Sequence, residues 1–357
     1  MINNKCFFFI IYFFTYCISI GQTPVYYQSI NFSLTGDSLK EELSNLILTT
    51  HNSLIEYTSS NSIDTWDVIK QSDLYLMDTT KVLLVYGYDD NDQAFENDRT
   101  RDKSLSCHAG PCDGLWNREH VFPKSLATPS LSTNFPGPGT DVHNLRACDY
   151  VSNSWRGNLK YGFGTGNSGV NTNGFWYPGD EWRGDVARII MYMYLRYPTQ
   201  CKPLAVGDGL ANHSNFGDMP NIFLEWNQQD PVDQYEINRN NQIFINQGNR
   251  NPFIDNPYLA TVIWNGPVAE NPWGPLGEEY DRTDKKILVY PNPANDILYI
   301  ESSNKINEVL VEVYDVFSNH LTSIKSFEIN MEKYNPGIYI LKIKLGETIN
   351  VIKIIKE

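Results

Sequence analysis

The chain has 357 residues, which is long enough for two domains and a sizeable core. Its net charge of −14 excludes a protein that coats nucleic acid through long-range attraction. It does not exclude an enzyme with a locally positive groove, because residues 118–160 carry five Arg or Lys against three Asp or Glu.

The first residues have the pattern of a secretory signal peptide. Lys5 gives a positive start, residues 6–20 form an apolar run, and Gly21 and Gln22 give a small-residue exit. We expect residues 1–22 to be a signal peptide, because the apolar run is short for a full membrane span. A transmembrane anchor is the alternative.

Four cysteines remain beyond this signal: Cys107, Cys112, Cys148 and Cys201. An even number of cysteines in an exported chain suggests disulfides. Cys107 with Cys112 and Cys148 with Cys201 is one of three possible pairings. Free buried thiols are the alternative, and zinc is disfavoured because the chain has no CxxC pair.

The exported part begins with a predicted helix and a predicted strand. Apolar residues from Leu39 to Ile55 are spaced by three and four, and Asp37 or Ser38 is a suitable cap. Residues 81–88 predict a strand, because they are rich in β-branched and aromatic residues. The acidic segment 89–102 predicts a solvated loop, since it lacks the glycine and terminal glutamate of an EF-hand.

Residues 115–121 predict a further strand, which Pro123 ends because proline cannot donate a hydrogen bond to a neighbouring strand. Glu119 and His120 are adjacent on it. Neighbouring side chains on a regular strand face opposite ways, so both can serve one phosphate only at a strand end or a kink. Pro123 puts them at such an end.

Residues 149–155 predict a helix, and Asn153 and Arg156 share one face if that helix continues far enough. These side chains add an amide ligand and a positive charge to the carboxylate and the imidazole of the preceding strand. Such a set can hold a divalent cation and a water against a phosphodiester. The stretch therefore predicts the active site of a metal-dependent nuclease.

The remainder of the chain changes character. Residues 182–197 and 222–226 predict helices, whereas residues 266–284 are rich in proline, glycine and acidic residues and predict a linker. Six short strands at roughly ten-residue spacing then predict a small β-sandwich. These strands are expected at residues 287–290, 297–301, 309–316, 323–329, 338–344 and 350–355.

Three motifs resemble the bacterial endonuclease I family of ββα-metal nucleases. They are Asn117-Arg118-Glu119-His120-Val121 with Pro123, Asp141-x-His143-Asn144-Leu145, and Asn153-x-x-Arg156-x-Asn158. Each motif alone is weak, but the three in order are specific, and the similarity extends over most of residues 30–265. The resemblance implies an α+β fold class, with a ββα-metal nuclease core, surrounding helices and then the small β-sandwich.

The resemblance also implies a role for each residue of the strand and helix. His120 is the general base that takes a proton from the attacking water, a task suited to a pKa near neutrality. Glu119 and Asn153 are the metal ligands, with Asn144 as the rival to Asn153. One carboxylate and one amide oxygen suit Mg²⁺, with Mn²⁺ or Ca²⁺ as alternatives.

The other motif residues are assigned supporting or phosphate-binding roles. Arg156 is the candidate phosphate clamp, with a surface salt bridge as the alternative. His143 and Asn144 are expected to brace the loop, and Asn158 to support the site. Residues 125–140 are shorter than in several family members and contain no arginine, so a second transition-state arginine has no evident source.

The tail resembles the type IX sorting domains of Bacteroidetes-like bacteria. The matching features are Val289-Tyr290-Pro291-Asn292-Pro293-Ala294, Pro336-Gly337-Ile338-Tyr339 and a final strand with Lys353 and Lys356. This resemblance implies export across two membranes by the type IX secretion machinery, followed by release or surface anchoring. A carbohydrate-binding sandwich is the alternative.

The sequence thus predicts a signal peptide (residues 1–22), a nuclease domain (23–265), a linker (266–284) and a sorting domain (285–357). The expected activity is metal-dependent hydrolysis of DNA, with RNA as a second substrate, little sequence preference and 5′-phosphate products. No stable protein partner is implied. The rivals are an adhesin on a decayed nuclease fold and another metallohydrolase such as a peptidase, although the chain has neither HExxH nor GxSxG.

Overall fold

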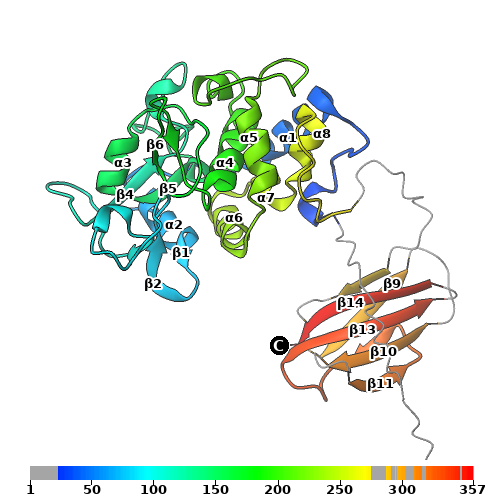
Figure 1. The fold of residues 1–357 in the computed structure, drawn as a ribbon. Helices are drawn as coiled ribbons and strands as arrows, with labels where there is room; N and C mark the ends of the chain where they lie inside the picture. The colour runs from blue at the N-terminus through cyan, green and yellow to red at the C-terminus, as the bar shows by residue number, and fades with distance from the viewer. Residues whose placement is uncertain are drawn as a thin grey trace, which may run out of the picture. The chain divides into compact units, whose positions relative to one another are not determined.

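The computed structural model divides the chain into two compact units, Met1–Gly277 and Glu278–Glu357. The residues that it describes are 23–274, 287–290, 294, 296–302, 309–315, 319–345 and 348–356. The predicted signal peptide therefore lies outside the described residues, and the predicted linker is described only to residue 274. The first unit combines helices and strands, whereas the second consists of strands (Figure 1), which confirms the α+β expectation.

The helices of the first unit are α1 (Gly36–Thr50), α2 (Thr65–Ser72), α3 (Tyr150–Arg156), α4 (Arg183–Arg196), α5 (Asn221–Gln229), α6 (Gln234–Gln247), α7 (Pro252–Asp255) and α8 (Tyr258–Trp264). Its strands are β1 (Leu74–Tyr75), β2 (Asp78–Leu83), β3 (Thr100–Asp102), β4 (Trp116–His120), β5 (Leu145–Asp149), β6 (Gly169–Val170) and β7 (Trp176–Tyr177). None of the helices in the described part of the chain combines the length and the apolar content that crossing a membrane requires.

Helix α4 is the centre of the helical part of this unit. Eleven of its fourteen residues are buried, as expected for a helix that is covered on every side. Helices α1, α5 and α7 pack against it. Figure 1 shows β4, β5 and α3 at one side of the unit, away from α1 and α8.

Strands β4 and β5 and helix α3 form the predicted ββα arrangement. The two strands pair antiparallel, from Trp116 opposite Asp149 to His120 opposite Leu145. Helix α3 begins directly after β5, because the Asp149 carboxylate caps it by accepting hydrogen bonds from the amides of Val151 and Ser152. The helix packs on both strands, so its inner face is turned toward β4.

Several predicted boundaries differ from the structure. Helix α1 begins at Gly36, so the predicted cap Asp37 lies inside its first turn. Strand β2 ends at Leu83, and Tyr86 adopts a left-handed backbone with φ of 75°, which a continuing strand cannot contain. The predicted acidic loop contains β3, because strand β2 pairs with residues Thr100–Asp102.

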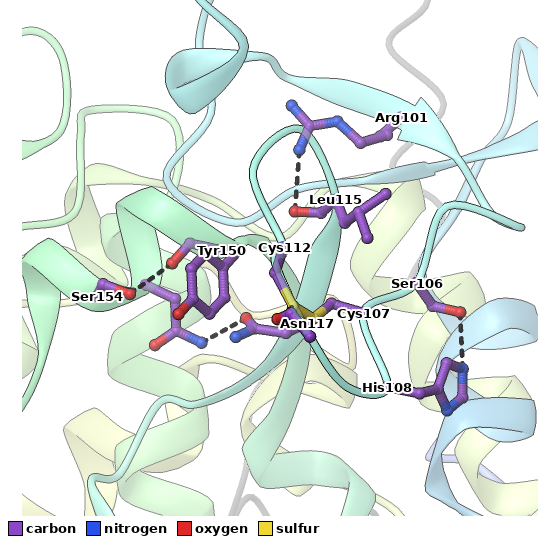
Figure 2. Close-up of a disulfide and its surroundings, with 11 residues drawn as sticks. Arg101, Ser106, Cys107, His108, Cys112, Leu115, Asn117, Tyr150 and Ser154 are labelled. Carbon is purple, nitrogen blue, oxygen red and sulfur yellow. Dashed lines mark hydrogen bonds between the residues drawn. A yellow bond between two sulfur atoms is a disulfide. The ribbon is translucent and has the colours of Figure 1, made fainter.

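The cysteines follow the prediction in one pair and depart from it in the other. Cys107 and Cys112 form a disulfide (Figure 2), but Cys148 and Cys201 are free and buried, so that predicted pair was wrong. Cys148 lies on β5, and its thiol donates to the carbonyl oxygen of Val85 at 3.4 Å. Cys201 lies on a different part of the chain, after the end of α4.

The second unit confirms the predicted sandwich. Its strands are β8 (Ile287–Tyr290), β9 (Ile297–Ser302), β10 (Leu310–Asp315), β11 (His320–Ile324), β12 (Glu328–Asn330), β13 (Gly337–Leu345) and β14 (Thr348–Lys356). They form one sheet in the order β11-β10-β13-β14 and another in the order β12-β9-β8, with a shared core that includes Leu298 and Leu341. The strand predicted at residues 323–329 is divided between β11 and β12.

Candidate active site

A cavity of about 460 Å³ lies where β4 ends beside α3. It is lined by residues from β4, the turn that follows it, α3 and a distant segment: Tyr57, Arg118, Glu119, His120, Pro123, Lys124, Ser125, Asn153, Gly157 and Asn158. The structure therefore brings Glu119, His120, Asn153 and Asn158 together, as the sequence predicts. It leaves Arg156, Asn144 and His143 outside the lining.

His120 is buried at the end of β4 and is held by a backbone group. Its Nε2 donates a hydrogen bond to the carbonyl oxygen of Gly139 at 2.8 Å. A carbonyl oxygen can only accept, so Nε2 carries the proton and Nδ1 keeps its lone pair. Burial, together with nearby cations such as Lys124, lowers the pKa of His120 to about 3. The imidazole is therefore neutral near pH 7 and can accept a proton.

Glu119 is buried beside His120 and is held by two side chains. Its Oε1 accepts a hydrogen bond from the Tyr86 hydroxyl at 3.0 Å and lies 3.3 Å from Nε of Arg156. Burial nevertheless raises the pKa of Glu119 to about 6. The two partners thus offset only part of the desolvation of this carboxylate, and a bound cation would stabilise its ionised form.

Asn153 enters the cavity from α3 with a fixed side-chain amide. Its Nδ2 donates to Oδ1 of Asn117 at 2.7 Å, and Figure 2 shows Asn117 next to the Cys107–Cys112 disulfide. This bond orients the Asn153 amide, and no described residue donates a hydrogen bond to its Oδ1. An amide oxygen fixed in this way is suited to bind a cation.

The donor set of the cavity suits a divalent cation. Nowhere in residues 23–274 or the described strands of the tail do three or more His, Cys, Asp or Glu side chains gather as a metal cluster. A cation here would take one oxygen each from Glu119 and Asn153 and fill its other positions with water and substrate phosphate. Mg²⁺ is commonly bound in this way.

Arg156, the candidate phosphate clamp, does not line the cavity. Its side chain is fully buried, and its guanidinium donates to the carbonyl oxygens of Val121 at 2.9 Å and Gly157 at 3.0 Å. Its Nε faces Glu119. The physical reason is that the last turn of α3 packs on β4, which carries this side chain under the strand. Arg156 is thus placed to orient Glu119.

The remaining predicted residues lie around the cavity. Both polar groups of the Asn144 side chain bind the backbone of Phe122, with Oδ1 accepting at 2.7 Å and Nδ2 donating at 3.2 Å. His143 is buried against the Tyr192 ring. Asn158 is exposed and donates to the Ser125 hydroxyl at 3.2 Å.

Sequence reasoning missed two tyrosines of this site. Tyr86 comes from the turn after β2 and hydrogen-bonds Glu119, and Tyr57 comes from the segment between α1 and α2 and lines the cavity. Neither lies in a motif, so no local signal could have found them.

Comparisons with known proteins agree with this geometry. The family described as Endonuclease I matches residues 35–258. The family described as a secretion system C-terminal sorting domain matches residues 288–357. Both matches fall on the regions whose motifs suggested them.

Three similar proteins are extracellular nucleases. The extracellular ribonuclease of Bacillus subtilis (strain 168) is 36% identical over 254 residues, which covers 68% of this chain and 80% of that protein. The extracellular ribonuclease of Bacillus amyloliquefaciens is 34% identical over 261 residues, covering 68% and 79%. The extracellular deoxyribonuclease of Aeromonas hydrophila is 37% identical over 73 residues, covering 20% and 26%.

Proposed function

The chain belongs to the endonuclease I family and carries a secretion sorting domain, so we propose that it is an exported, metal-dependent endonuclease that hydrolyses RNA and DNA. The nuclease family and the secreted or cell-surface location follow from these two matches. One observation carries the finer proposal. Glu119, His120 and Asn153 line a single cavity, which holds a neutral imidazole together with a carboxylate and an amide oxygen.

His120 acts as the general base in this proposal. Nδ1 accepts a proton from a water molecule, whose oxygen bonds to phosphorus in line with the 3′ oxygen of the scissile bond. The P–O3′ bond then breaks and the leaving 3′ oxygen takes a proton from solvent water, which leaves a 5′ phosphate and a 3′ hydroxyl. The negative charge of a bound phosphate favours the imidazolium and so opposes the lowering of the pKa of His120 by burial.

Glu119 and Asn153 hold the cation, with Mg²⁺ as the ion that fits best and Mn²⁺ or Ca²⁺ as alternatives. When bound, the ion supplies neutralisation of the charge that develops on the phosphate and on the leaving oxygen. Arg156 keeps the Glu119 carboxylate in place from beneath the strand. Lys124 is exposed at the cavity, where its ammonium can contact a substrate phosphate.

The substrate class rests on chemistry and on the relatives. The cavity lining offers groups for phosphate and no element that would read base edges in a groove, which supports little sequence preference. The two long matches are named ribonucleases and the short one a deoxyribonuclease. These names support a wider range than the DNA preference expected from the motifs.

The second unit directs export in this proposal. Its match to a sorting domain supports recognition by the type IX secretion machinery. The proposed order is a signal peptide at residues 1–22, the nuclease at 23–265, a linker at 266–284 and the sorting domain at 285–357.

The first test replaces the base. His120→Ala should lower the rate of cleavage of plasmid DNA and of an RNA oligonucleotide by at least about 100-fold, the usual contribution of a general base. His320→Ala is the matched control, because this exposed histidine lies on β11 in the other unit. EDTA should abolish the wild-type activity.

Two outcomes would contradict the proposal. A His120→Ala variant with wild-type rates would remove His120 from the mechanism. A wild-type protein that binds nucleic acid but cleaves none with Mg²⁺, Mn²⁺ or Ca²⁺ would favour the binding protein on a decayed nuclease fold.

A further inference from the structure

A column of stacked planar side chains leads to His120. The His108 ring packs on Trp66 with ring centroids 4.4 Å apart. The guanidinium carbon of Arg118 lies 4.0 Å from the Trp66 ring and 3.4 Å from the Tyr57 ring. The Tyr57 ring is in turn stacked on His120, with centroids 5.7 Å apart and planes 29° apart.

Three hydrogen bonds of Arg118 go to the chain between Tyr57 and the start of α2. Its guanidinium donates to the carbonyl oxygen of Tyr57, to the Thr65 hydroxyl at 2.8 Å and to the Thr58 hydroxyl at 3.1 Å. Its Nε is buried and has no hydrogen-bond partner among the described residues. The guanidinium also packs against two aromatic rings, Tyr57 and Trp66. Arg118 therefore clamps the Tyr57 segment onto β4.

The position of His120 needs more than its hydrogen bond. The bond from Nε2 to Gly139 fixes one direction in the ring plane but leaves rotation about that direction. Such a rotation would swing the Nδ1 lone pair away from the attacking water. A flat ring stacked on one face of the imidazole removes this freedom, and Tyr57 supplies it.

We propose that Tyr57 is the positioning residue for His120 and that Arg118 acts through Tyr57 instead of by gripping substrate phosphate. The inference rests on the proposed function, because it assumes that His120 is the base. In this proposal the flat shape of the Arg118 guanidinium matters most, because it packs on the Tyr57 ring. In a phosphate contact its positive charge would matter most.

The first pair of variants separates the effect of the Tyr57 ring from the effect of its hydroxyl group. Tyr57→Leu removes the flat surface and should lower kcat by about 10- to 100-fold, since a small misplacement of a catalytic group can have that effect. KM should stay within about twofold, because the proposal gives Tyr57 a contact with His120 and none with the substrate. Tyr57→Phe keeps the ring and should restore kcat.

The second pair separates planarity from charge. Arg118→Lys keeps the charge without a flat group, and Arg118→Gln keeps a flat amide without the charge. The proposal expects Arg118→Lys to lower kcat at unchanged KM and Arg118→Gln to be the milder change. A phosphate contact expects the reverse order and a raised KM.

A double variant tests whether Tyr57 acts through His120. In the His120→Ala background, Tyr57→Leu should cause no further loss of activity, because the group that it positions is gone. Nitrogen NMR of the metal-free protein gives a readout without catalysis. Tyr57→Leu should broaden or shift the His120 ring signals, while Tyr57→Phe leaves them unchanged.

The outcomes distinguish this inference from the proposed function. Normal kcat in Tyr57→Leu, or losses that multiply with His120→Ala, would overturn the inference while leaving His120 as the base. A wild-type protein without nuclease activity, or an active His120→Ala variant, would overturn the proposed function instead. If Tyr57→Leu fails to fold, Arg118→Lys with wild-type kcat still refutes the positioning role.

Discussion

Glu119 is buried in a pocket whose positive charge and hydrogen bonds offset only part of the desolvation of its carboxylate. Burial raises its pKa to about 6, although Arg156 and Tyr86 lower it. A raised carboxyl pKa means that the folded protein holds the proton more tightly than the unfolded chain. This group therefore stabilises the metal-free fold below about pH 4.5, and the contribution is lost as the pH rises through 6.

The affinity for a metal ion should have the opposite pH dependence and rise with pH. A cation needs the ionised carboxylate, so the affinity for Mg²⁺ should reach its full value only well above pH 6 and fall as the pH is lowered through that value. Calorimetric titration between pH 5 and 8 would measure it. His120→Ala is a suitable control, since the pKa of His120 is about 3 and lies outside this window.

The two titrations separate the contributions of the two residues. His120→Ala should give the same pH dependence of Mg²⁺ binding as the wild type, whereas Glu119→Gln should bind Mg²⁺ weakly at every pH. A wild-type affinity that is flat from pH 5 to pH 8 would exclude Glu119 as the ligand.

At the residue scale, the sequence predicts site residues that lie close together because they are near one another along the chain. Glu119 and His120 could be predicted to share a site because a proline follows the strand end, and Asn153 because its helix succeeds the paired strand. Arg156 was assigned to phosphate because the sequence does not show that its side chain is buried. That burial depends on how α3 packs on β4. Tyr57 was missed, because only the tertiary fold carries it to the cavity.

At the scale of elements, the choice of ligand is a choice between helix and loop. Asn153 lies on α3 and lines the cavity, whereas Asn144 ends the short 3-10 turn Val142–Asn144 and binds the backbone of Phe122. Both are asparagines, so their chemistry is the same and their placement decides. We predict that the helix supplies the ligand.

Substitutions at the two positions should have different effects. Asn153→Ala should raise the Mg²⁺ concentration for half-maximal activity, and Asn153→Asp should restore binding in part because it keeps an oxygen donor. Asn144→Ala leaves two buried backbone groups of Phe122 without that partner and should lower stability by about 1–3 kcal/mol per group. Thermal unfolding and Mg²⁺ titration of each variant measure the two effects. If only Asn144→Ala shifts the Mg²⁺ requirement, the assignment is reversed.

Elements with a strong local pattern were predicted best. The predicted helix at 182–197 corresponds to α4, and the strands of the tail follow their turn residues. Errors arose where tertiary contacts decide. Strand β2 stops early because Tyr86 turns inward to Glu119, and Cys148 stays a free thiol inside β5.

For the whole molecule, the division into two units has a consequence for export. Every residue that lines the cavity belongs to the unit Met1–Gly277, and the second unit has its own hydrophobic core. A unit with its own core can be removed without exposing the core of the other. Catalysis and export should therefore be separable.

Deleting residues 285–357 tests this separation. The purified truncated protein should cleave nucleic acid with kcat/KM within about twofold of the full chain, because all groups of the proposed mechanism remain. In a host with the type IX machinery, the truncated protein should accumulate in the periplasm, whereas the full chain reaches the medium or the cell surface. Fusion of residues 266–357 to an exported reporter is the matched control, since it should carry the reporter out without the nuclease. Normal secretion of the truncated protein would refute the sorting role. Loss of activity in the purified truncated protein would mean that catalysis needs the tail.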